Sequence, residues 1–120
     1  MSGERLTGLA ARVQGWYYVI SGIWPIIDIH SFQAVTGPKN DLWLVRTVGV
    51  LVIVIGATLL FAARRRRLDA PVVLLAIGSA LGLAGIDLVY ALAGRIAPVY
   101  LFDAAAETVL AGLWAEGARH

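Results

Sequence analysis

The 120-residue chain is 59% hydrophobic and only 15% charged, with a mean hydropathy of +0.77. A soluble domain of this size could not bury so much apolar surface, so we expect lipid to surround much of the chain. Cysteine is absent, which excludes disulfides, thiolate metal sites and cysteine nucleophiles. The net charge of +2 owes much to one run, Arg64 to Arg67, which indicates membrane orientation rather than nucleic-acid binding.

Four stretches are long and apolar enough to cross a membrane, which takes about 20 residues. The first opens with Trp16, Tyr17 and Tyr18, an aromatic belt typical of the membrane interface. The fourth is the least hydrophobic. The stretches cover about residues 13–29, 42–63, 71–93 and 97–114. The predicted fold is therefore all-α, a single four-transmembrane-helix bundle in up-down-up-down order.

Turn and cap residues separate these stretches. Residues 31–41 contain Thr-Gly-Pro, and either Asn40 or Asp41 can cap the second helix. Asp69 can cap the third helix, and Pro71 then falls in its first turn, where its missing N–H is not needed.

Basic residues predict the orientation. Seven fall on the side of the termini, against three on the other side. The two groups are Arg5, Arg12, Arg64 to Arg67 and Arg119, and then Lys39, Arg46 and Arg95. Because cytoplasmic loops are enriched in Lys and Arg, both termini are predicted to lie in the cytoplasm.

Ionisable residues concentrate in the outer half of the predicted bundle. Asp28 falls in the last turn of the first helix, Arg46 about one turn inside the second, and Asp87 near the outer end of the third. Asp103 and Glu107 are four residues apart, so they share one face of the fourth helix. We expect these five residues to form one interior cluster that opens to the outside, with Trp24, Trp43, Tyr90 and Tyr100 beside it.

A structural role is the alternative for part of this cluster. Asp28, Arg46 and Asp87 are close enough to the surface to form a hydrated ion-pair network at the top of the bundle. Glu107 is harder to explain in that way. An acid near the middle of the membrane has to be protonated, paired with arginine or in contact with water.

Metal and catalytic motifs are not found. His30 follows Asp28 by two residues, so on a helix their side chains point about 200° apart and cannot share a metal ion. No nucleophile elbow, zinc-protease helix, phosphate loop or dinucleotide-binding pattern is present. No cofactor, metal or catalytic residue is therefore predicted.

Small residues predict helix contacts. Asp87 shares a face with Ala80 and Ala84, while Gly78 and Gly82 form a separate pair four residues apart. Such faces let helices approach closely in lipid. We therefore expect a homo-oligomer or a place in a larger membrane complex, with membrane lipids as further partners.

One segment carries a resemblance. WPIIDIHSFQAVTGPKNDLWLVRTVG, residues 24–49, resembles the central stretch of small four-helix bacterial membrane proteins of unknown function. This resemblance implies the bacterial inner membrane and no activity. Small multidrug transporters and double-barrelled fluoride channels fit poorly, because their characteristic first-helix residues are not found here.

Three functions remain open. The leading hypothesis is a module that binds or transports a small cationic, protonatable or lipid-like ligand at the acidic cluster. The second is an accessory or assembly subunit of a larger inner-membrane complex. The third is a membrane enzyme in which Asp103 and Glu107 act as acid and base, although no motif supports it.

Overall fold

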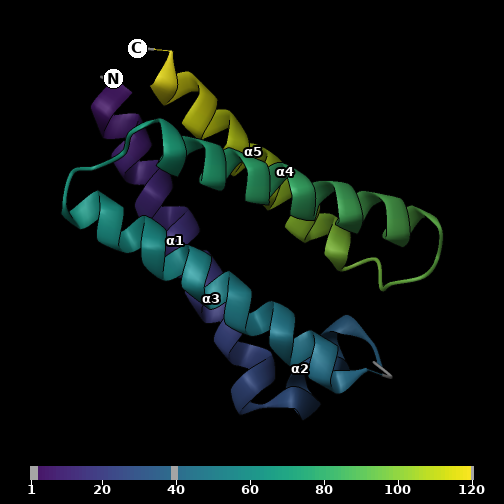
Figure 1. The fold of residues 1–120 in the computed structure, drawn as a ribbon. Helices are drawn as coiled ribbons and strands as arrows, with labels where there is room; N and C mark the ends of the chain where they lie inside the picture. The colour runs from purple at the N-terminus through teal and green to yellow at the C-terminus, as the bar shows by residue number, and fades with distance from the viewer. Residues whose placement is uncertain (1–2, 39–40, 120) are drawn as a thin grey trace.

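The computed structural model describes residues 3–38 and 41–119, and all of the regular structure there is helical. This confirms the all-α prediction, but five helices are present rather than four (Figure 1). They are α1 (Gly3–Ile27), α2 (Ile29–Thr36), α3 (Leu42–Arg64), α4 (Ala70–Leu92) and α5 (Tyr100–Ala118).

The first predicted helix differs most from the structure. It was predicted over residues 13–29, whereas α1 begins at Gly3 and ends at Ile27. The short helix α2 then occupies most of the stretch that was predicted as a connection. The break falls at Asp28 because its side chain accepts a hydrogen bond from the Ser31 backbone N–H and so caps α2. The same hydrogen bond lowers the pKa of the exposed Asp28 carboxyl from its usual value.

The long helices α3 and α4 agree with their predicted bounds to within one residue. Asp41 and Asp69 occupy their N-cap positions, although neither side chain makes a capping hydrogen bond. Pro71 lies in the first turn of α4, as predicted. Asn40, the alternative cap for α3, lies outside the described residues. The last helix starts three residues later than predicted and continues to Ala118.

Two pairs of glycines bring α1 and α3 into backbone contact. Gly15 faces Gly56, and Gly22 faces Gly49. A Cβ added at Gly56 would lie 2.6 Å from the carbonyl oxygen of Gly15, and one at Gly49 would lie 2.7 Å from that of Gly22. Gly15 and Gly22 are seven residues apart on α1, and Gly49 and Gly56 are seven residues apart on α3. On each helix, therefore, both glycines fall on the same face. These helices therefore pack as closely as two backbones can.

The remaining helices are arranged around α1. It packs against α3 on one side and against α5 on another, and α5 in turn packs against α4. The α1–α3 and α4–α5 pairs diverge from the end of the molecule at which both termini lie (Figure 1). At that end an apolar core closes the gap between them; its buried members are Ala10, Ala11, Leu59, Ala76 and Trp114.

Two of the helices, α3 and α4, are long and apolar enough to cross a membrane. Only 17% of the most apolar window in each is buried within the fold, so neither is enclosed as the core helix of a soluble protein would be. The glycine face of α4 is also open. A Cβ added at Gly78, Gly82 or Gly85 would meet nothing within 4 Å.

Alanine at Gly56 and at Gly82 should therefore have opposite effects on stability. Gly56→Ala forces α1 away from α3 and should lower the free energy of unfolding by about 1–3 kcal/mol. Gly82→Ala gains helix propensity in open space and should raise it by up to about 1 kcal/mol. Unfolding of both variants in mixed micelles, followed by circular dichroism, measures the difference. Equal effects would contradict the backbone contact.

Candidate functional site

A cavity of about 1190 Å³ lies between the two helix pairs. Its lining extends from Tyr18 and Glu107, in the middle of their helices, to the α4–α5 connection at Gly94 and Arg95. Asp41, between α2 and α3, also belongs to that rim. The cavity therefore extends to the end opposite the termini. The helix pairs are furthest apart there (Figure 1).

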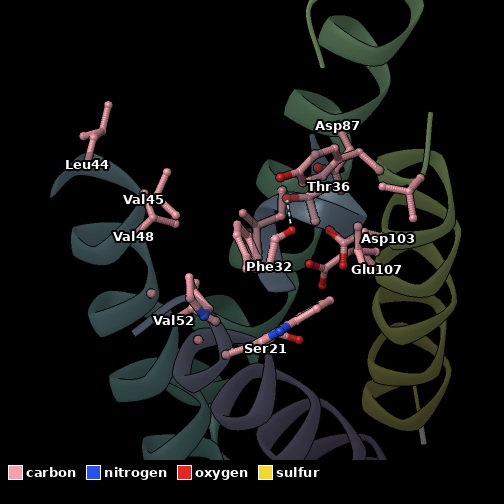
Figure 2. Close-up of a pocket in the computed structure, with 18 of the residues that line it drawn as sticks. Ser21, Phe32, Thr36, Leu44, Val45, Val48, Val52, Asp87, Asp103 and Glu107 are labelled. Carbon is pink, nitrogen blue, oxygen red and sulfur yellow. Dashed lines mark hydrogen bonds between the residues drawn. The ribbon is translucent and has the colours of Figure 1, made fainter. Parts of the chain in front are cut away.

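Three carboxyl groups converge on one wall of the cavity. Asp87 comes from α4, and Asp103 and Glu107 come from α5 (Figure 2). Asp103 lies close enough to the other two for their negative charges to interact. Carboxylates this close repel one another when all are ionised, so the group favours binding a proton or a cation.

Burial makes this cluster costly. Glu107 is 1% exposed and Asp87 6% exposed, and both belong to the most buried polar residues of the chain. Within residues 3–38 and 41–119, no arginine forms an ion pair with any of the three acids. The Oδ2 atom of Asp87 is buried and has no hydrogen-bond partner among the described residues. A buried acceptor without a donor costs about 1–3 kcal/mol, so this atom is available to a ligand.

Adjacent tyrosines of α1 supply hydrogen bonds to two of the acids. The Tyr18 hydroxyl donates to Oε1 of Glu107 at 2.7 Å, and the Tyr17 hydroxyl donates to Oδ1 of Asp103. Each tyrosine hydroxyl donates to one carboxyl oxygen, so the acid wall is held in place from α1 through one oxygen of Asp103 and one of Glu107.

A buried amide lies one helical turn below the cavity, on the side of the termini. Gln14, which is fully buried, donates from Nε2 to the Ala76 carbonyl at 3.0 Å. Its Oε1 accepts the indole N–H of Trp114 at 2.7 Å. These bonds tie α1 to α4 and α5 one turn below Tyr18. Beyond them lies the apolar core, so the cavity is closed toward the termini.

The wall opposite the acids is apolar. The side chains of α3 that line it are Leu44, Val45, Val48 and Val52 (Figure 2). Aromatic side chains cover the outer part. Trp24 and Phe32 meet edge to face with their ring centroids 5.3 Å apart, and Tyr100 lines the cavity from the start of α5.

Five of the nine predicted site residues meet at this cavity, and four do not. Those that line it are Trp24, Asp87, Tyr100, Asp103 and Glu107; those that lie outside it are Asp28, Arg46, Trp43 and Tyr90.

The four residues outside the cavity are exposed, each for a local reason. Asp28 caps α2, and Arg46 follows Val45, so it is turned about 100° from the last wall residue before it. Trp43 is 69% and Tyr90 40% exposed. Arg46 therefore lies outside the expected cluster of five and forms no ion pair with its acids among the described residues.

Several residues of the site were not predicted. Tyr17 and Tyr18 were predicted to belong to an aromatic belt at the membrane interface, yet their hydroxyls donate hydrogen bonds to Asp103 and Glu107. Their spacing from Gln14 and Ser21 was the available signal, because residues 14, 17, 18 and 21 share one helix face. The acid and the arginine at the rim of the cavity are Asp41 and Arg95, whereas Asp28 and Arg46 were expected beside it.

Comparison with known proteins gives no further assignment. No family model matches the chain, and no curated protein or solved structure is detectably similar to it. Among the residues that the structure describes, no group of three His, Asp or Glu side chains is placed to hold one metal ion.

The Gln14–Trp114 bond can be tested by a double-mutant cycle. Gln14→Leu leaves the indole N–H unpaired and Trp114→Phe leaves the amide oxygen unpaired, so each should cost about 1–3 kcal/mol of unfolding free energy. The double variant should cost less than the sum of the two, with a coupling energy of about 0.5–3 kcal/mol. Unfolding in mixed micelles measures all three; strictly additive losses would refute the hydrogen bond.

Proposed function

We propose that the chain is a multi-pass protein of the bacterial inner membrane in which α1, α3, α4 and α5 all cross the bilayer. The helices α1 and α5 contain 25 and 19 residues, and a crossing takes about 20. Both pack beside the two long apolar helices. Large apolar side chains on their outer surfaces support lipid contact; Trp16, Ile20, Phe102 and Val109 are each more than half exposed.

In this arrangement the termini and Arg64 to Arg67 face the cytoplasm. The arginine run connects α3 to α4 at the end of the molecule where both termini lie (Figure 1). The excess of basic residues at that end supports the orientation. The cavity then opens toward the outside of the cell, and its acids lie within the outer half of the membrane.

We further propose that the cavity binds a small cation or protonatable ligand. The observation that carries this proposal is the unpartnered Oδ2 of Asp87, which is buried beside Asp103 and Glu107 in a cavity open at one end. A bound cation would provide both the missing donor and the missing positive charge. The Gln14–Trp114 hydrogen bond and the apolar core below the cavity support binding from one side rather than an open pore.

The orientation is tested by single cysteines, which the cysteine-free chain allows without other changes. Ala93→Cys lies at the end of α4 beside the cavity rim, and Ala118→Cys lies at the end of α5 beside the termini. In intact spheroplasts, a membrane-impermeant maleimide should label the first and not the second. Lysis should expose both. Labelling of Ala118→Cys before lysis would contradict the proposal.

Cation binding is tested on the purified full chain in lipid nanodiscs, with sodium, potassium, methylammonium and guanidinium as probes. We expect at least one of these to bind, and Glu107→Gln or Asp87→Asn to weaken it by about tenfold or more, because each removes a charge from the cluster. Affinity should also fall as the pH is lowered, since protons compete for the same carboxyls. Calorimetry measures all of these effects.

Asp69→Asn is the matched control, because it removes one acid from the exposed cap of α4, outside the cavity. Its affinity should equal that of the wild type. If none of the four probes and no larger ammonium ligand binds, or if Asp69→Asn weakens binding as much as Glu107→Gln does, the proposal fails.

A further inference from the structure

The cavity has two chemically different walls that face each other. Asp87, Asp103 and Glu107 lie on the side of α4 and α5, and the valine and leucine side chains of α3 lie on the other (Figure 2). A ligand that fills the cavity therefore meets negative charge on one side and hydrocarbon on the other. This asymmetry favours a ligand that has one positively charged part and one apolar part.

The size of the cavity leaves room for much more than a bare inorganic ion. Pockets for drug-sized ligands are about 300–1000 Å³, and this cavity reaches about 1190 Å³. A monovalent metal ion at the carboxyls would leave the wall at Val48 and Val52 without a partner. An organic ligand with an apolar body would cover that wall and remove apolar surface from water.

The head of such a ligand is defined by the groups on the acid wall. The Asp87 Oδ2 atom lacks a donor, and the tyrosine hydroxyls engage only one oxygen each of Asp103 and Glu107. A primary ammonium carries three N–H donors, which is what this group of acceptors lacks.

We propose that the ligand of this cavity is an amphipathic amine whose ammonium group binds Asp87, Asp103 and Glu107 and whose apolar body packs on Val45, Val48 and Val52. The inference rests on the proposed cation binding and narrows it to one chemical class. The ammonium enters from the rim at Arg95 and Asp41 and reaches acids that extend from the first turn of α5, at Asp103, to its middle, at Glu107.

Three probes separate the contributions of head and body. Methylammonium has the head alone, 2-phenylethanol the body alone, and 2-phenylethylamine both. Binding to the full chain in nanodiscs is measured by calorimetry, with empty nanodiscs as the blank for partitioning into lipid. We expect 2-phenylethylamine to bind at least about tenfold more tightly than either of the others.

Isosteric threonines test the apolar wall. The Val48→Thr, Val52→Thr double variant adds two hydroxyls to the α3 wall and should weaken 2-phenylethylamine about tenfold while leaving methylammonium unchanged. The matched control is Val50→Thr, Val54→Thr, which alters exposed valines of α3 that do not line the cavity. It should bind both probes as the wild type does.

The outcomes distinguish this inference from the proposed function. If methylammonium or potassium binds as tightly as 2-phenylethylamine, the amphipathic ligand is refuted while cation binding stands. If 2-phenylethanol binds as tightly as the amine, the ammonium head is refuted. If none of the probes binds the wild type, both proposals fail. The wild-type series decides among these even if a threonine variant does not fold.

Discussion

The backbone contact between α1 and α3 is the constraint on which the rest of this structure depends. With glycine at 15, 22, 49 and 56, the two helices meet without intervening side chains. The third side of α1 is then free to face α4 and α5, and the residues there are Gln14, Tyr17, Tyr18 and Ser21. The Tyr17 and Tyr18 hydroxyls on that side reach Asp103 and Glu107 of α5, so α1 joins the closely packed helix pair to the acid wall.

Along that face of α1, the polar groups at one end have all their hydrogen-bond partners, whereas those at the other end have only some of them. At the closed end, the Gln14 amide has a donor and an acceptor, so it links three helices at little cost. One turn further, Tyr18 meets only one oxygen of Glu107, and beyond it an oxygen of Asp87 has no partner among the described residues. A polar network that is complete at one end and open at the other is suited to anchoring helices at the first and receiving a ligand at the second.

The parts of the fold that could be predicted from sequence are those set by local patterns. The bounds of α3 and α4 follow from long apolar runs behind Asp41 and Asp69, and the shared face of Asp103 and Glu107 follows from their spacing. The break at Asp28 was missed because a window of apolar residues hides one capping side chain. The place of Arg46 was missed because helix neighbours are set by tertiary packing, and the pairing of glycines decides which face of α3 turns toward α1.

The two sets of glycines should also evolve differently. Any side chain at Gly15, Gly22, Gly49 or Gly56 meets a backbone, so selection for folding alone retains glycine there, whatever the protein binds. At Gly78, Gly82 and Gly85 nothing in the described part of the chain resists a larger residue, and helix propensity favours one. In related chains these three positions should drift to alanine or leucine unless another helix covers them. If related chains keep these glycines on α4, another helix in the membrane packs against that face. If they have larger residues there, the chain acts without such a partner.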